Sequence, residues 1–266
     1  MQKISIQSIA IGSFDGIHLA HQTLIKQVDA LVIIERNTGY LTAGYKRSLF
    51  TKKLCCFYHF EKISSLTPLE FVTKLQKDFP LLEKIVVGYD FSFGHKKSGS
   101  IKELKTFFQA EVCVIEEVCL DGIPIHSRTI KNALKEGDIF LANRLLGRDY
   151  TIEGELIKGQ GLGKKSLVPT LNVIVSKGYQ LPLSGVYATK TYINHQWFSS
   201  ITFLGHRVTT DGEFAVESYV IDEVLENAPK NIEIQFLKFI RTNRKFESLE
   251  SLKRQIEEDI KEVKNH

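Results

Sequence analysis

The chain has 266 residues, of which 43% are hydrophobic and 25% are charged, a composition typical of folded domains and not of disordered segments. This length accommodates two domain cores. The formal net charge of +4, with no basic tail, suits anionic small molecules but falls short of the charge expected of a nucleic-acid-binding surface. The cysteines lack the spacing of zinc or redox sites, and no apolar span or secretory leader is evident. We therefore expect a cytoplasmic protein with reduced thiols that contacts no membrane.

The first half of the chain alternates apolar runs with helical stretches. Strands are predicted at 4–11, 31–34, 84–88 and 110–118, and helices at 19–31 and near 101–108. Strands that alternate with helices form a parallel sheet with helices on its faces. Ligands of such sheets bind beyond the carboxyl ends of the strands. The pattern therefore predicts a Rossmann-like α/β domain with its site after the first strand.

Residues 12–21 follow that first strand and read GSFDGIHLAH. His18 and His21 are three residues apart at a helix start, so both imidazoles can lie on one face. Unpaired backbone N–H groups there attract anions, and two histidines beside them could donate to a triphosphate. Gly12 and Gly16 allow a phosphate to approach the backbone closely. The same spacing also fits two surface histidines beside a helix cap, and spacing alone does not decide between these interpretations.

The second half of the chain reads as a small β-barrel. Six short strands are predicted at 151–158, 171–175, 185–193, 198–204, 214–221 and 231–240, a pattern typical of an antiparallel barrel. A C-terminal amphipathic helix that packs on the barrel is predicted by apolar residues at spacings of three and four, Leu249, Leu252, Ile256, Ile260 and Val263. The two domains are expected to cover residues 1–147 and 148–266.

A glycine-rich run at 159–165 precedes the second predicted barrel strand. It is not a P-loop, because Lys158 stands where that motif requires its first glycine, and Lys164 breaks the dinucleotide pattern G-x-G-x-x-G. Thr170 and Asn172 follow as a Thr-x-Asn sequence that enters a strand. Taken alone, that sequence is more often a turn and a pleat than a metal site.

Several ordered segments resemble the bacterial bifunctional riboflavin kinase/FMN adenylyltransferases, also called FAD synthetases. In the first half, residues 12–21 are similar to their G-x-F-D-G-x-H-x-G-H segment and residues 87–94 to V-G-x-D-F-x-F-G. Residues 137–148 resemble the G-D-x-x-x-A-x-x-L-L-G-R helix that closes the family's first module. In the second half, residues 154–172 resemble the riboflavin kinase segment that ends in P-T-A-N, and residues 185–188 match its G-V-Y-A strand.

For the first domain, the resemblance implies FMN adenylyltransferase activity with His18 and His21 as catalytic residues. It implies that Asp90 binds flavin. The residues implied to bind nucleotide or phosphate are Gly12, Phe14, Asp15, Gly16, Ser127, Arg128 and Lys131.

For the second domain, the resemblance implies riboflavin kinase activity. Thr170 and Asn172 are implied to hold Mg²⁺ bound to the co-substrate ATP, because hard neutral oxygens suit that ion. Glu217 is implied to be the base and Arg207 to bind flavin, whereas without the flanking pattern Glu217 reads as a solvated strand glutamate. The loop residues implied to bind ATP phosphates are Gly159, Gly163 and Lys164.

The chain also departs from the family pattern at several places. Ala20 replaces a glycine, and Lys131 replaces the arginine of S-S-T-x-I-R, which loses a bidentate fork that Arg128 could supply instead. The T-F-x-P-H-P segment is missing, and residues 33–37 stand near its place. Residues 203–209 read FLGHRVT in place of N-I-G-x-R-P-T.

The resemblance implies phosphorylation of riboflavin to FMN and adenylylation of FMN to FAD, both with ATP. One alternative is a riboflavin kinase whose first domain has lost adenylyl transfer. Another is a non-catalytic flavin- or nucleotide-binding regulator, against which Thr170, Asn172 and Glu217 argue. A nucleotidyltransferase with another acceptor leaves the barrel unexplained. The expected partners are riboflavin, FMN, FAD and ATP, without nucleic acid or membrane, and the sequence gives no oligomeric state.

Overall fold

The structure is a computed structural model that describes residues 5–36, 40–157, 169–207, 212–223 and 229–264. The chain divides into two compact units, Met1–Ser127 and Arg128–His266. Among the described residues, no helix combines the length and the apolarity that crossing a bilayer requires.

The first unit is built on a parallel sheet with β1 at its centre. Its strands are β1 (Ser8–Gly12), β2 (Ala30–Glu35), β3 (Leu54–His59), β4 (Lys84–Gly88) and β5 (Glu111–Ile115), in the order β3-β2-β1-β4-β5. Every neighbouring pair is parallel, which confirms the predicted α/β architecture. The chain leaves β1 toward β2 on one side and reaches β4 on the other. The carboxyl ends of β1 and β4 therefore form the topological switch point where such sheets bind ligands.

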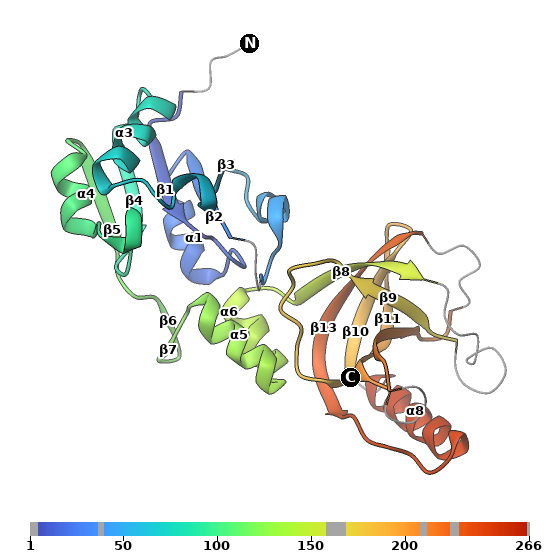
Figure 1. Cartoon of the computed structure of the whole chain (residues 1–266). Coiled ribbons are helices and arrows are strands. Elements are labelled where there is room, and N and C mark those ends of the chain that lie inside the picture. The colour runs from blue at the N-terminus through green and yellow to red at the C-terminus, as the bar shows by residue number, and fades with distance from the viewer. Residues whose placement is uncertain (1–4, 37–39, 158–168, 208–211, 224–228, 265–266) are drawn as a thin grey trace. The chain divides into compact units, whose positions relative to one another are not determined.

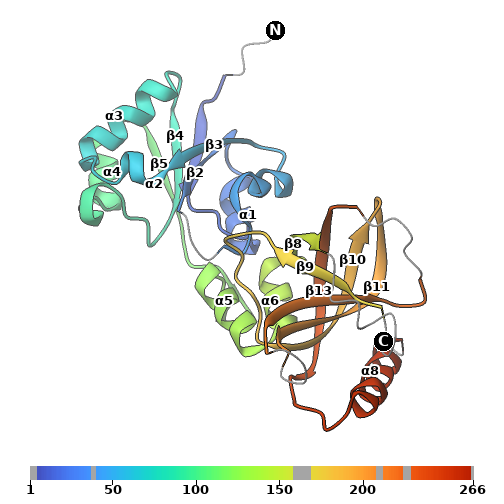
Figure 2. The same cartoon turned by 45° about the vertical axis from the view of Figure 1, so that its right-hand side comes forward.

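Helices cover both faces of this sheet (Figures 1 and 2). On one face, α3 (Pro68–Asp78) and α4 (Ile101–Phe107) pack on β1 and β4 through a core that includes Phe71, Leu104 and Ile85. On the other face, α1 (Leu19–Ile25) packs through Leu24 and Ile25. Short helical segments complete the unit: η1 (Gly44–Phe50), α2 (Phe60–Ile63) and η2 (His95–Lys97).

The predicted helix at 19–31 is too long, because α1 ends at Ile25 and β2 begins at Ala30. The carboxylate of Asp29 accepts hydrogen bonds from the backbone N–H groups of Gln7 and Ser8, at 3.1 and 3.0 Å. These bonds anchor the chain beside the start of β1, and the fully buried run that follows forms a strand. The apolar residues after Asp29 therefore belong to the sheet and not to the helix.

Several elements of the first unit were absent from the sequence prediction, and the longest of them are the strand β3 and the helix α3. The signal for α3 was present, since Thr67 and Glu70 form a capping box and Pro68 occupies the first helical turn. The strand β3 carries a weaker signal, because its residues are half-buried or exposed and show no clean alternation. Edge strands of this kind are hard to recognise from hydrophobicity alone.

The second unit is a closed antiparallel barrel with a C-terminal helix, as predicted. Its strands are β8 (Tyr150–Ile157), β9 (Leu171–Val175), β10 (Gly185–Ile193), β11 (Gln196–His206), β12 (Phe214–Val220) and β13 (Asn231–Thr242), closed in the order β10-β11-β12-β9-β8-β13. The helix α8 (Leu249–Lys264) packs Ile260 and Val263 against the barrel wall. The nearly buried carboxylate of Asp259 pairs with Arg241 of β13 at 2.8 Å, which fixes the helix in place.

Two helices precede the barrel and belong to the same compact unit. They are α5 (Ser127–Glu136) and α6 (Ile139–Leu146), which follow a hairpin of β6 (Cys119–Leu120) and β7 (Ile123–Pro124). The side chain of Asn143 donates to the carbonyl of Phe236 at 2.9 Å and accepts from the N–H of Tyr150 at 2.8 Å. The compact units thus divide at the first residue of α5, between Ser127 and Arg128, whereas the division into functional domains at 147/148 stays a prediction.

These contacts predict how truncation changes stability. A fragment of residues 148–266 retains the barrel and α8 and should fold, but it loses Ile139, Leu145 and Leu146, which are buried in the full chain. Because each buried aliphatic side chain contributes about 1.5–3 kcal/mol, its free energy of unfolding should be at least ~3 kcal/mol below that of a 128–266 fragment. Chemical denaturation of the two fragments measures the difference. Equal stabilities would show that α5 and α6 do not support the barrel.

Candidate functional site

The turn out of β1 has an unusual backbone. Phe14, Gly16 and Ile17 have φ values of +48°, +90° and +42°. Left-handed backbone is costly for a bulky or β-branched residue, so such a turn persists only where its surroundings hold it. Phe14 and Ile17 are fully buried, at 0% and 1% exposed, and join the core on the α1 face of the sheet. Burial of both side chains therefore offsets part of the strain.

This turn leads directly into α1, where His18 and His21 lie side by side. His18 is the N-cap of α1, and its Nδ1 accepts the backbone N–H of His21 at 3.4 Å. The two imidazole rings are stacked, with centroids 3.6 Å apart and planes inclined by 16°. Because Nδ1 of His18 accepts this bond, a neutral His18 carries its proton on Nε2, which is then a donor. The spacing that predicted a shared face thus produces face-to-face rings.

Asp15 and Ser127 hold the same turn through polar contacts. The Asp15 side chain is 4% exposed, and its Oδ1 accepts the backbone N–H groups of Leu41 and Thr42 at 2.7 and 3.2 Å. The Ser127 hydroxyl donates to the Asp15 carbonyl at 2.8 Å. These contacts join the turn to segments far away in the sequence. The roles of Asp15 and Ser127 toward a nucleotide stay predictions.

Sequence reasoning missed Arg47, whose side chain is wholly buried. Its Nη1 donates to the carbonyl of Ser13 at 2.8 Å, and its Nη2 pairs with the Glu35 carboxylate at 2.9 Å. A single arginine in a stretch without a motif carries no sequence signal of burial. Its place in the site follows only from tertiary contacts.

The carboxyl ends of β4 and β5 carry a second polar cluster. The Tyr89 hydroxyl donates to Glu117 at 2.6 Å, and Nε2 of His126 lies 3.2 Å from the same carboxylate oxygen. The hydrogen bond to Glu117 raises the pKa of Tyr89 to about 12, and the same bond, with that to His126, lowers the pKa of Glu117. Asp90 follows Tyr89 and is exposed to solvent at the switch point. Its expected contact with flavin stays a prediction.

Two predicted phosphate-binding residues lie on α5 in the second unit. Arg128 is exposed and Lys131 is half-buried, and their spacing of three places them on one helix face. The replacement of arginine by lysine at position 131 remains a departure from the family pattern. Their role in the phosphate site stays a prediction.

In the barrel, the structure brings together three residues predicted for different tasks. Asn172 on β9 and Glu217 on β12 are direct cross-strand partners. Nε of Arg207 donates to Oε1 of Glu217 at 2.7 Å, and Nη2 donates to Oδ1 of Asn172 at 3.1 Å. The predicted base, a predicted metal ligand and a predicted flavin-binding residue therefore form one cluster.

The surroundings of this cluster are partly accessible. The Arg207 and Glu217 side chains are 20% and 23% exposed, so a small ligand can reach them. The amide nitrogen of Asn172 points to the Thr170 carbonyl at 3.4 Å, which leaves its oxygen on the side of the cluster. Gly159, Gly163 and Lys164 lie outside the described residues. Within the described residues, no group of three His, Cys, Asp or Glu side chains could hold a metal ion alone.

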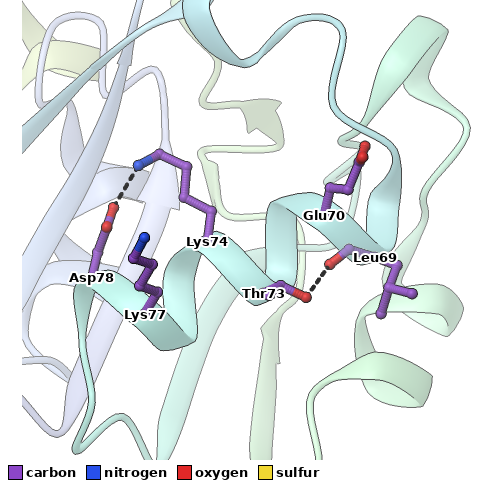
Figure 3. Close-up of a pocket in the computed structure, with 6 residues that line it drawn as sticks. All are labelled: Leu69, Glu70, Thr73, Lys74, Lys77 and Asp78. Atoms are coloured by element: carbon purple, nitrogen blue, oxygen red, sulfur yellow. Dashed lines mark hydrogen bonds and ion pairs between the residues drawn. The ribbon is translucent and has the colours of Figure 1, made fainter.

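A shallow groove on the first unit lies apart from these residues. It is lined by one helix only, with Leu69, Glu70, Thr73, Lys74, Lys77 and Asp78 of α3 (Figure 3). Lys74 and Asp78 form an ion pair at 2.8 Å across one helical turn. None of the predicted site residues lines this groove, and we assign it no role.

Comparisons with known proteins match both units. Residues 146–266 match the family model of riboflavin kinase, and residues 47–129 match that of FAD synthetase. A bifunctional riboflavin kinase/FMN adenylyltransferase of Buchnera aphidicola subsp. Acyrthosiphon pisum is 31% identical, over 95% of this chain and 90% of its own. A relative of the same description from Listeria monocytogenes is 29% identical, over 96% and 91%.

One solved structure matches over the full length. It is a crystal structure described as a macrolide-efflux protein from Streptococcus pneumoniae, with a TM-score of 0.87 and 24% identity, and the match covers 100% of this chain and 96% of that one. At this identity the likeness concerns the fold alone. It supports the succession of a parallel sheet, a barrel and a terminal helix in one chain.

The cluster at the ends of β4 and β5 generates a prediction about titration. Removing the carboxylate with Glu117→Gln should move the pKa of Tyr89 from about 12 back toward its ordinary value of 10.0. Ultraviolet absorbance of the phenolate, with Tyr89→Phe subtracted, measures this pKa. The hydrogen bond stabilises the folded state below pH 10 and is lost as the pH rises through the pKa of Tyr89. Glu116→Gln is the control, and a Tyr89 pKa unchanged by Glu117→Gln would contradict the assignment.

Proposed function

Because this chain belongs to the bifunctional riboflavin kinase/FMN adenylyltransferase family, we propose that it phosphorylates riboflavin to FMN and then adenylylates FMN to FAD. ATP is the donor in both steps. The observation that carries this proposal is the pairing of Glu217 with Asn172 on neighbouring barrel strands, joined by Arg207. That arrangement offers a carboxylate base beside a hard oxygen ligand, which are the two groups that phosphorylation of a hydroxyl requires.

In the kinase step, the 5′-hydroxyl of riboflavin attacks the γ-phosphorus of ATP and ADP leaves. Glu217 accepts the hydroxyl proton, since its carboxylate is partly exposed and fixed in place by Arg207. Phosphoryl transfer demands positioning more than covalent chemistry, so a base held by strand register and by a guanidinium suits the task. Arg207 acts here by orienting Glu217, and its contact with flavin remains part of the proposal.

The donor set beside Glu217 fits a magnesium ion that arrives with ATP. The Asn172 amide oxygen is turned toward the cluster, and Thr170, whose hydroxyl we propose as the second ligand, lies two residues earlier on the chain. Hard neutral oxygens suit Mg²⁺, which takes its remaining ligands from phosphates and water. When bound, Mg²⁺ neutralises phosphate charge. Thr170 and Asn172 are the residues that would hold the ion, and the Asn172 amide oxygen, which accepts from Arg207 at 3.1 Å, would be its amide ligand.

In the adenylyl step, the phosphate of FMN attacks the α-phosphorus of a second ATP and pyrophosphate leaves. His18 and His21 donate hydrogen bonds to the phosphates and stabilise the charge that develops on the leaving group. The chemistry uses no protein nucleophile. The site lies at the carboxyl end of β1, where the strand order of the sheet reverses.

A kinase without adenylyl transfer is the second candidate. The observation that favours it is the loss of the family's T-F-x-P-H-P segment and of the arginine at position 131. Both changes fall in the first half of the chain, so they leave the kinase proposal untouched. For either activity we propose a cytoplasmic location, which the four free cysteines of the structure support.

Glu217→Gln tests the kinase base. The substitution keeps the size of the side chain but removes the proton acceptor, so FMN formation should fall roughly a hundredfold or more while riboflavin still binds. Chromatography separates riboflavin from FMN, and flavin fluorescence measures binding. The control is Glu155→Gln on β8, an exposed strand glutamate paired with Lys230. Near-normal turnover of Glu217→Gln would remove this residue from the role.

Replacement of both His18 and His21 by alanine tests the adenylyl site. Conversion of FMN to FAD should fall roughly a hundredfold or more, because each lost donor costs a few kcal/mol of transition-state stabilisation. Riboflavin phosphorylation should change little, and His195→Ala in the β10–β11 hairpin is the control. An equal loss of both activities would make the histidines structural. A wild-type protein that makes FMN but no FAD would establish the kinase-only alternative.

A further inference from the structure

The guanidinium of Arg47 is the most deeply buried charge among the described residues of the first unit. Its side chain is 0% exposed, and each of its three nitrogens has a different acceptor. Nε donates to the Gly44 carbonyl at 3.1 Å, Nη1 to the Ser13 carbonyl at 2.8 Å, and Nη2 to the Glu35 carboxylate at 2.9 Å. A buried charge is tolerated only when it is paired and its donors are satisfied. In Arg47, each of the three guanidinium nitrogens donates a hydrogen bond.

Aromatic rings complete this environment. The guanidinium carbon lies 5.0 Å from the centre of the Tyr40 ring and 5.9 Å from that of Phe57 on β3, distances at which a cation is attracted to a ring face. Glu35 is the last residue of β2 and is 17% exposed, so its charge is also largely removed from water. Arg47 is therefore held from two directions. Glu35 belongs to the sheet, and Gly44 belongs to η1, the same short helical segment as Arg47.

One of the three acceptors belongs to the strained turn after β1. Ser13 directly precedes Phe14, the first of the residues with positive φ, and Ile17, the last of them, directly precedes His18. The hydrogen bond from Arg47 fixes the entrance of this turn, and the bonds to Asp15 fix its middle. A strained turn that is held at its entrance and middle presents its last residue in one geometry.

We propose that Arg47 is a positioning residue for adenylyl transfer, which fixes the Ser13 carbonyl and thereby the placement of His18 and His21. This role rests on the adenylyltransferase activity proposed above. Arg47 does not contact the reacting atoms. A lysine could not replace it, because a single ammonium group on a flexible stem cannot serve Gly44, Ser13 and Glu35 in one plane.

The experiment compares Arg47→Lys and Arg47→Met with the wild-type full chain. Loss of the Arg47 guanidinium should lower kcat for conversion of FMN to FAD at least tenfold. The KM for ATP should change less, because the two histidines are displaced but not removed. Arg47→Lys should lie between the wild type and Arg47→Met. Riboflavin phosphorylation in the same samples should stay within twofold, because its proposed residues belong to the other unit.

Hydrogen exchange provides a readout that does not depend on activity. The amide of His21, which donates to His18, should exchange at least tenfold faster in Arg47→Lys than in the wild type. The matched control is Lys74→Met, which breaks an exposed ion pair of similar length on α3 and should change neither measurement. Where Arg47→Met fails to fold, Arg47→Lys carries the test, because it retains the buried positive charge.

Wild-type kcat in Arg47→Lys, or an equal fall in both activities, would overturn the proposal. If the wild type makes no FAD, the adenylyl activity fails. The positioning of the turn is then still decided by the exchange rate of His21. An unchanged exchange rate in Arg47→Lys would show that Arg47 does not hold the turn, whatever the activity of the chain.

Discussion

The hydrogen bond between Arg47 and the Ser13 carbonyl joins the central strand of the first unit to a buried ion pair at the end of β2. The turn that follows must adopt left-handed backbone at Phe14 and Ile17, two residues that avoid it. Burial of their side chains and polar contacts from three distant segments maintain this turn. Without them the two histidines would share a helix face but have no fixed place at the switch point.

In the barrel, the candidate site residues are positioned by strand pairing. Cross-strand register sets Asn172 opposite Glu217, and the ladder of β9 and β12 maintains that spacing without strain. Arg207 then bridges the two side chains. The first unit therefore relies on a turn that tertiary contacts must hold, whereas the second relies on strand pairing. We therefore expect the proposed adenylyl site to be the more sensitive of the two to substitutions outside the site.

The sequence predicted the elements whose hydrophobic pattern is strong. The bounds of β4, β9 and β10 agree with the prediction, because runs rich in β-branched residues end there at clear turn residues. The helix at 19–31 was too long, since a buried strand and a helix look alike over a short apolar run. The edge strand β3 was missed because its residues are only half-buried.

The candidate site residues likewise include some whose placement the sequence could predict and others whose placement it could not. Spacing alone was enough to place the imidazoles of His18 and His21 on one face, and the structure stacks them. The significance of Arg47 was invisible, because it arises from acceptors at Ser13 and Glu35 that only the fold brings near. The joining of Arg207 to Glu217 and Asn172 depends in the same way on barrel closure, which no local pattern encodes.

The fate of the ATP phosphates tests the two-step account most directly. The protein is incubated with riboflavin, Mg²⁺ and ATP that is radiolabelled at either the γ- or the α-phosphate, and the flavins are separated by chromatography. The account predicts that γ-label enters FMN and persists in FAD, whereas α-label enters FAD only. FMN that carries γ-label, without any α-labelled FAD, would contradict the second step. The absence of γ-label from FMN would contradict the first.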